Sequence, residues 1–241
     1  MNGIIENLKK AIELNFVKDN RYMLIVDGLK NTLVITLFAV LLGTFIGLLL
    51  AFIRVTYDNN RKSSGIFGII IKLLNFIANI YITIIRGTPA VIQLMFFYFC
   101  IFTSRDANGA FVAIVAFGIN SGAYLAEIFR GGINSIDKGQ MEAGRSLGLS
   151  YIQTMIYIII PQAIKVVVPS LLNEFIALIK ETSIAGYVAV QDLTRGGDII
   201  RSRTYDAWTP LIAVAIIYLI LTYALSLVSK NIEAGFKKQE R

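Results

Sequence analysis

The stretch "NTLVITLFAVLLGTFIGLLLAFI", residues 31–53, contains no charged side chain. It is longer than the ~20 apolar residues that a helix needs to cross the ~30 Å hydrocarbon core of a bilayer. It shows no alternation of apolar and polar residues, which a strand of a membrane barrel would require. An isolated apolar run can satisfy its backbone hydrogen bonds in lipid only as a helix. Residues 31–53 therefore predict a membrane-spanning helix.

Two further runs, 107–126 and 207–229, are also free of charged residues. The whole chain of 241 residues is 56% hydrophobic and 16% charged, and its mean hydropathy is +0.66. Soluble domains have about 25% charged residues. The composition therefore predicts an all-α membrane protein that crosses the bilayer several times.

The alternation of apolar and polar segments predicts five spans separated by polar segments. The second apolar segment is too long for one straight span, and Pro89 in "RGTP" interrupts it, because proline removes a backbone hydrogen bond. Residues 1–23 mix apolar and charged side chains in the manner of an amphipathic helix on a membrane surface. The expected spans are about 24–53, 66–102 (broken at Pro89), 110–129, 151–179 and 209–229, with a polar loop at 54–65 and a basic tail at 237–241.

The sequence offers little for catalysis or metal binding. It has no histidine, the commonest general base and metal ligand, and its single cysteine, Cys100, excludes a disulfide framework. No paired carboxylates or nucleophile–base arrangement stands out, so we expect no catalytic residue, no metal site and no enzyme activity. The net charge of +7 is explained by basic flanks near lipid headgroups, and we expect no nucleic-acid partner.

Gly43 and Gly47 lie one helical turn apart in the first span. Such a pair allows a second helix to approach closely. Glycine is also common in membrane helices without a packing role. The sequence leaves both interpretations open.

A polar segment, "DKGQMEAGRSLGL" at 137–149, separates two apolar stretches. Ser135 or Asp137 is suited to cap the start of a short helix. Gly144 and Gly148 are one turn apart and, on one helical face, would let another backbone come close. Such a helix fits the groove of a partner protein, but composition alone favours a solvated helix that binds nothing.

The identity and spacing of particular residues instead favour a helix that docks on a partner. Glu142-Ala143-Gly144, followed by Gly148, Ile158 and Ile160-Pro161 at fixed spacing, resembles the EAA motif of ABC importer permeases. Gly144 replaces an alanine of that motif and Ile160 replaces a leucine. The stretches 121–148, 85–99 and 178–190 further resemble the permeases of polar amino acids, the importers of histidine, glutamine, arginine and glutamate, with Glu181 in place of an aspartate. The resemblance extends over about 24–236.

The resemblance implies the fold of type I ABC importer permeases, with the N-terminus outside and the C-terminus cytoplasmic. Lysine and arginine counts do not decide this orientation by themselves. The resemblance implies that the segment 137–149 is a cytoplasmic coupling helix that docks on a separate ATPase subunit. The implied coupling residues are Gln140, Glu142, Ala143, Gly144, Leu147 and Gly148.

The resemblance also implies the partners. These are two copies of an ABC ATPase, a second permease chain that is identical or homologous, an extracytoplasmic amino-acid-binding protein, the amino-acid substrate and the lipid bilayer of a prokaryotic inner or plasma membrane. The chain contains no G-x-x-x-x-G-K-[ST] motif, so it has no P-loop to hold nucleotide phosphates. We therefore expect no cofactor on this chain, and ATP and magnesium on the partner.

Ionisable residues inside spans mark candidate pathways, because they are costly in lipid. A broken helix also offers backbone groups to a zwitterion. For Arg86 and Glu181 the alternative is a structural ion pair or a side chain that extends to the interface, and for Glu127 and Arg130 a helix-end pair is favoured. The candidate pathway residues are Arg86, Gly87, Pro89, Gln93, Glu181, Thr182 and Ser183.

An ion-coupled secondary carrier that acts without an ATPase is the main alternative function. Such carriers are commonly built from internal repeats. No convincing repeat is visible in this sequence, and five spans do not divide into two equal halves. Which amino acid is transported, and whether the two permease chains are identical, stay open.

Overall fold

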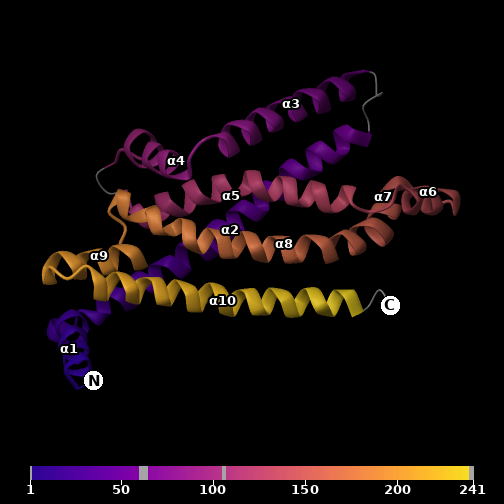
Figure 1. The fold of residues 1–241 in the computed structure, drawn as a ribbon. Helices are drawn as coiled ribbons and strands as arrows, with labels where there is room; N and C mark the ends of the chain where they lie inside the picture. Colours follow the sequence, from indigo (N-terminus) through magenta and orange to yellow (C-terminus); the bar gives the residue numbers. More distant parts are fainter. Residues whose placement is uncertain (1, 60–64, 105–106, 239–241) are drawn as a thin grey trace. The chain divides into compact units, whose positions relative to one another are not determined.

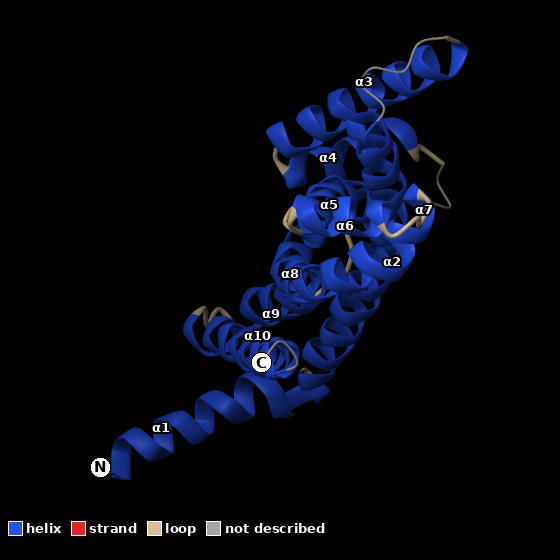
Figure 2. Ribbon diagram, turned by 90° about the vertical axis from the view of Figure 1, so that its right-hand side faces the viewer, coloured by secondary structure: helices blue, strands red, loops and turns tan. Residues whose placement is uncertain are grey.

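The computed structural model describes residues 2–59, 65–104 and 107–238, and within those ranges the chain is helical and contains no strand (Figures 1 and 2). The α-helices are α1 (Asn2–Ile12), α2 (Tyr22–Asn59), α3 (Ile66–Gly87), α4 (Ala90–Phe96), α5 (Gly109–Asn134), α6 (Lys138–Ser146), α7 (Tyr151–Thr154), α8 (Ile160–Glu181), α9 (Leu193–Thr204) and α10 (Trp208–Lys238). Short 3-10 helices and π-helices adjoin several of them: η1 (Glu13–Val17), η2 (Lys18–Asn20), η3 (Phe97–Ile101), η4 (Met155–Ile159) and η5 (Thr182–Val188).

Five helical segments in the described part of the chain are long and apolar enough to cross a membrane. They are Tyr22–Asn59, Ile66–Gly87, Gly109–Asn134, Tyr151–Val188 and Trp208–Phe236. This confirms the prediction of an all-α membrane protein with five spanning helices.

The second span is shorter than the predicted 66–102. It ends at Gly87, and Ala90–Ile101 forms a separate short apolar helix. Thr88 has an extended backbone (φ −121°, ψ 146°), because the ring of Pro89 disfavours the helical conformation of the residue before it. The proline was therefore correctly recognised as a break, but it separates two helices instead of bending one.

The first span is longer than predicted at its C-terminal end. α2 continues through Arg54 and Asp58 to Asn59, so the expected polar loop at 54–65 begins later; residues 60–64 lie outside the described ranges. Charged residues are compatible with a helix that leaves the hydrocarbon core, and neither glycine nor proline interrupts this stretch. At the other end, positive φ angles at Asp19 (55°) and Asn20 (52°) separate the N-terminal segment from α2.

The described residues form two compact units, each of which combines three stretches of the chain. The first unit contains the N-terminal stretch to Ala39, Ala90–Phe117 and Ile176–Leu225. One cluster of buried apolar residues in it consists of Ile25, Leu193, Ile200 and Val214. The second unit contains Val40–Pro89, Gly118–Phe175 and the chain from Ser226.

Within the first unit, the fully buried Asp192 caps α9. Its carboxylate accepts hydrogen bonds from the backbone N–H groups of Arg195 (3.0 Å) and Thr194 (3.2 Å). Burial nevertheless raises the pKa of Asp192 to about 6. Thr32 of α2 accepts a hydrogen bond from Leu193 N (3.1 Å), so the start of α9 is tied directly to the first span.

Within the second unit, glycines allow α2 and α5 to pack closely. A Cβ atom on Gly47 would lie 2.8 Å from the Cβ of Leu125 and 3.0 Å from the backbone N of Ala126. A Cβ atom on Gly43 would lie 3.1 Å from the backbone N of Gly122. Because these neighbours include backbone atoms, they cannot move aside as a flexible side chain would. The packing interpretation of the Gly43–Gly47 pair is confirmed.

We predict that Gly47→Ala lowers the stability of the purified protein by about 1–3 kcal/mol, the usual cost of overpacking a tight contact. Gly131→Ala is the matched control, since Gly131 also lies in a helix but a Cβ there meets nothing within 4 Å. Thermal unfolding in detergent measures both variants. A melting temperature for Gly47→Ala equal to that of Gly131→Ala would contradict the close packing of α2 on α5.

Candidate functional site

The short helix α6 is built by local hydrogen bonds. The carboxylate of Asp137 caps its start by accepting a hydrogen bond from Gly139 N at 2.6 Å. After α6, Ser150 and Gln153 form a reciprocal capping box that starts α7, with Gln153 Oε1 accepting from Ser150 N at 2.8 Å. α6 packs against α7 and η4, so its position is fixed by the chain that follows it (Figure 1).

Gly144 and Gly148 do not share a helical face, which corrects the sequence-based expectation. α6 ends at Ser146, and Gly148 lies beyond it with φ +86°, a conformation that glycine adopts without strain. Gly144 is buried against the same chain, because a Cβ there would lie 2.6 Å from Thr154 Cγ2. Gly144 therefore holds α6 against its own helix bundle, whereas Gly148 makes the turn into α7.

The outward surface of this segment is polar except for one large apolar side chain. Gln140, Glu142 and Ala143 are exposed. Leu147, which directly follows α6, is 82% exposed. Contact of this leucine with another apolar surface would be favourable. The expected docking residues are thus partly inward (Gly144) and partly outward (Gln140, Glu142, Ala143, Leu147).

A polar cavity of about 640 Å³ lies beside α6, between the ends of α2 and α5 and the start of α7. Its lining includes Asp58 and Asn59 of α2, Arg130 of α5 and Glu142 of α6. Asn59 donates a hydrogen bond to the hydroxyl of Tyr151 at 2.6 Å. The structure therefore links the end of α2 to the start of α7 around a recess that borders α6.

Glu127 of α5 is the centre of an ion cluster that joins three helices. Its carboxylate accepts a hydrogen bond from Arg54 of α2 at 2.5 Å and pairs with Arg130 at 3.5 Å. Arg86 of α3 lies 3.9 Å from the same carboxylate. Arg130 also pairs with Asp58 of α2 at 3.5 Å. The expected pair of Glu127 and Arg130 is present, but it belongs to a larger network.

Sequence reasoning missed Arg54 and Asp58, because it placed them in a loop. The position of Arg54 directly after the charge-free run 31–53 could have indicated that it belongs to the same helix. It also missed Tyr124, whose ring lies 5.3 Å below the Arg86 guanidinium. A cation over an aromatic ring is attracted by the ring's negative face. Arg86 is therefore held by both a carboxylate and a ring, while its side chain stays 44% exposed.

The other candidate pathway residues have different surroundings. In the second unit, Gly87 and Pro89 are exposed at the end of α3. In the first unit, α4 packs against η5, and Gln93 of α4 is buried. Thr182 is fully buried, and its hydroxyl donates a hydrogen bond to Ile179 O at 2.7 Å.

At the end of α8, the residues on either side of Thr182 are more accessible. Glu181 and its neighbour Lys180 are exposed, and Ser183 is partly exposed. Glu181 and Ser183 thus have accessible surface in this chain, and Thr182 has none.

A polar pair inside the spans also escaped the sequence analysis. Ser121 of α5 is fully buried and donates a hydrogen bond to Glu174 of α8 at 2.9 Å. The rule that singled out Glu181, an ionisable residue within an apolar helix, applies equally to Glu174. Its position between Pro169 and Lys180 in α8 would have revealed it.

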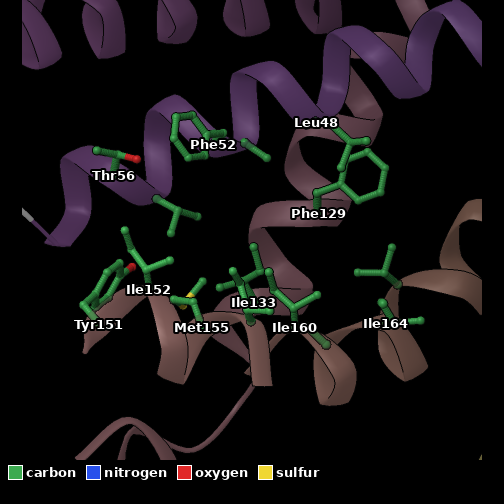
Figure 3. Close-up of a pocket in the computed structure, with 15 residues that line it drawn as sticks. Leu48, Phe52, Thr56, Phe129, Ile133, Tyr151, Ile152, Met155, Ile160 and Ile164 are labelled. Carbon is green, nitrogen blue, oxygen red and sulfur yellow. The ribbon is translucent and has the colours of Figure 1, made fainter. Parts of the chain in front are cut away.

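Another cavity in the second unit has a volume of about 540 Å³, and its lining is almost entirely apolar. Figure 3 shows Phe52 and Leu48 of α2 and Phe129 of α5 facing the side chains of α7–α8 across it. Thr56 and Tyr151 supply the hydroxyl groups of the lining. An amino acid would lose its water here without enough polar partners, which is unfavourable. This cavity suits an apolar chain and not a polar substrate.

Known proteins are similar to this chain over most of its length. Residues 43–238 match the model of the family described as "Binding-protein-dependent transport system inner membrane component". The chain is 40% identical over 217 residues to the glutamine transport system permease protein GlnP of Escherichia coli (strain K12), covering 89% of this chain and 93% of the relative. It is 38% identical over 215 residues to a putative GlnP of Rickettsia typhi, covering 88% of this chain and 93% of the relative.

Solved structures show the same similarity. The chain resembles a chain in the crystal structure of an amino acid ABC transporter with histidines, with a TM-score of 0.79 and 38% identity, covering 91% of this chain and 97% of that chain. It also resembles a chain of the MetNI methionine ABC transporter in an inward-facing conformation, with a TM-score of 0.75 and 22% identity, covering 89% of this chain and 96% of that chain. At that identity the second match shows the fold alone.

We predict that Glu127→Gln lowers stability by about 1–3 kcal/mol, between the costs of breaking an exposed and a buried ion pair, because the side chains of the cluster are partly exposed. The change leaves three arginines without their shared counter-charge. Glu6→Gln is the control, since its pair with Lys10 lies on the surface and such pairs contribute little. Thermal unfolding compares the two, and equal melting temperatures would show that the cluster does not hold the helices together.

Proposed function

The chain belongs to the family of binding-protein-dependent transport system inner membrane components, and we propose that it docks on a separate ATPase through α6. It is the membrane-spanning permease subunit of an ABC importer for amino acids, as the chain-long similarity to glutamine permeases and to an amino acid ABC transporter supports. The function as an ATP-driven permease is thus favoured over an ion-coupled secondary carrier. We place the protein in the cell membrane of a prokaryote.

The observation that carries the docking proposal is the geometry of α6. This helix stands at the EAA position and is held from behind by Gly144, which packs on Thr154. Its outward side combines polar groups with the exposed Leu147. A rigid short helix with an apolar anchor is a common way to fill a partner's groove. Motion of a partner would therefore be transmitted to α7 and α8 and not lost in a flexible loop.

The proposed assembly follows from this docking surface. Two ATPase subunits bind and hydrolyse ATP with magnesium, each beneath one of two permease chains that are identical or homologous. α6 then faces the cytoplasm, which places the N-terminus outside and the C-terminus inside. A separate extracytoplasmic protein delivers the amino acid.

We propose that the transported amino acid is polar, because the relatives' names refer to glutamine. Arg86 is suited to a carboxylate, since Glu127 is already engaged by Arg54 and Arg130 at shorter distances. Glu181 is suited to an ammonium group, because its side chain is exposed at the end of α8. Gly87, Pro89, Gln93 and Ser183 complete the proposed pathway set, with Thr182 in a supporting role.

Uptake in proteoliposomes tests the function as a whole. We expect a labelled polar amino acid to enter only when the permease, its ATPase, the binding protein and ATP are all present. Uptake by the permease alone, driven by an ion gradient, would instead identify a secondary carrier.

We predict that Leu147→Ala weakens binding of the ATPase about tenfold, because full burial of a leucine side chain contributes about 1.5–3 kcal/mol. The melting temperature of the permease should not change, since Leu147 is 82% exposed. Tyr205→Ala is the control, because Tyr205 is 96% exposed but lies in the turn between α9 and α10. Co-purification of the ATPase measures the effect, and normal recovery with Leu147→Ala would remove α6 as the docking element.

We predict that Glu181→Gln worsens half-saturation or turnover by about tenfold, because it removes a charge-assisted contact to the substrate. Glu181→Asp is the control and should be tolerated, since it keeps the charge. Reconstituted uptake and thermal unfolding are measured together. Normal uptake with a lowered melting temperature for Glu181→Gln would assign the residue a structural role only.

A further inference from the structure

A small polar pocket of about 160 Å³ lies between α2, α3 and α5 in the second unit. It is distinct from the apolar cavity in Figure 3 and shares only Asp58 and Arg130 with the recess beside α6. Polar side chains of all three helices line it: Arg54, Tyr57, Asp58, Asn75, Asn79 and Arg130. Asn75 and Asn79 are one turn apart on α3 and so lie on the same face of the helix.

The pocket carries a surplus of positive charge. Its own lining holds two arginines against the single carboxylate of Asp58. The larger ion cluster gives the same balance, because Arg54, Arg86 and Arg130 pair with Glu127 and Asp58 among the described residues. Within that part of the chain, the cluster therefore holds one more positive charge than negative charges.

Arg130 also has an unused hydrogen-bond donor at this place. Its Nε atom is buried and makes no hydrogen bond to the described residues. A buried donor without a partner is destabilising, because it has lost its hydrogen bonds to water. A ligand with anionic oxygen atoms would satisfy this donor and the surplus charge together.

The depth of the pocket corresponds to the edge of the hydrocarbon core. Arg54 directly follows the charge-free run 31–53, and Arg130 follows the charge-free run 107–126 by only one turn. On α3, Asn75 lies just inside Lys72, which borders the charge-free run 73–85. Basic pockets between helices at this level are suited to the phosphate groups of lipids.

The neighbouring surface of α3 is suited to the rest of a lipid molecule. Leu73, Phe76 and Ile77 are 57%, 61% and 54% exposed. They project from the outward side of α3, away from the face that carries Asn75 and Asn79, so acyl chains on that surface would lie one helix width, ~10 Å, from the pocket. An apolar surface next to a cationic pocket distinguishes a phospholipid from a fully water-soluble anion.

We propose that this pocket binds the phosphate group of an anionic phospholipid. The guanidinium of Arg130 holds phosphate oxygens, a geometry that arginine favours, and the amides of Asn75 and Asn79 add donors. The bound lipid would keep the cluster of α2, α3 and α5 electrically neutral. That the lipid comes from the cytoplasmic leaflet rests on the proposed function, since α5 leads from Arg130 directly into α6.

The test measures lipid retention by the full-length permease in nanodiscs of phosphatidylcholine with a minor share of phosphatidylglycerol. Native mass spectrometry after gentle detergent release should find phosphatidylglycerol bound in preference to phosphatidylcholine. Two variants, Arg130→Gln and Asn79→Leu, should lower the apparent affinity for phosphatidylglycerol at least about tenfold, because charge-assisted hydrogen bonds are lost. Asn79→Leu fills the pocket without breaking an ion pair, so it separates lipid binding from stability.

Lys230→Gln is the control, since it removes one exposed positive charge of the same unit outside the pocket. It should retain the lipid as the wild type does. Equal retention by all variants, or no preference for phosphatidylglycerol, would overturn the proposal. A second arm adds inorganic phosphate to nanodiscs of pure phosphatidylcholine. If phosphate stabilises the wild type there as strongly as phosphatidylglycerol does, the pocket binds free phosphate and the lipid assignment is wrong.

Transport activity is not part of this readout. Loss of the lipid preference would therefore leave the importer assignment intact, and a failure of ATP-driven uptake would leave the lipid site intact.

Discussion

The structure depends on one constraint: within the hydrocarbon core no water is present to satisfy polar groups, so the chain must satisfy them itself. The backbone does so by forming helices, which is why the charge-free runs are all helical. Apolar attraction between helices is weak in lipid, because lipid chains are as apolar as leucine. Close van der Waals packing at Gly43 and Gly47 therefore holds α2 against α5. The contacts with backbone atoms of α5 show how close that packing is.

The same constraint explains the ion cluster around Glu127. An isolated arginine near the bilayer core is costly, but arginines of α2, α3 and α5 share one carboxylate and thereby tie their helices together. Arg86 is the most loosely held of the three. The accessibility of Arg86 is what makes it a pathway candidate, and the unsatisfied Nε donor of Arg130 is what makes the neighbouring pocket a candidate lipid site.

The sequence predicted the fold class, the number of spans and the position of the EAA segment, because hydropathy and local capping are encoded within short stretches. It did not predict where helices end. Arg54 and Asp58 are polar and looked like a loop, yet they continue α2 because the end of a span is wet enough for charges. It also misplaced Gly144, since its burial depends on Thr154 and Ile158, which only tertiary contact brings near. The pair of Ser121 and Glu174 was missed for the same reason.

The central claim is that α6 transmits the motion of an ATPase to the membrane helices, and its most direct measurement is site-specific photo-crosslinking in the assembled transporter. A photoreactive amino acid replaces Leu147, the exposed apolar side chain beside α6. We expect a crosslink to the ATPase subunit whose yield changes when ATP binds. A photoreactive residue at Tyr205 should give no such product. Crosslinks from position 147 only to lipid or to the permease itself would contradict the account.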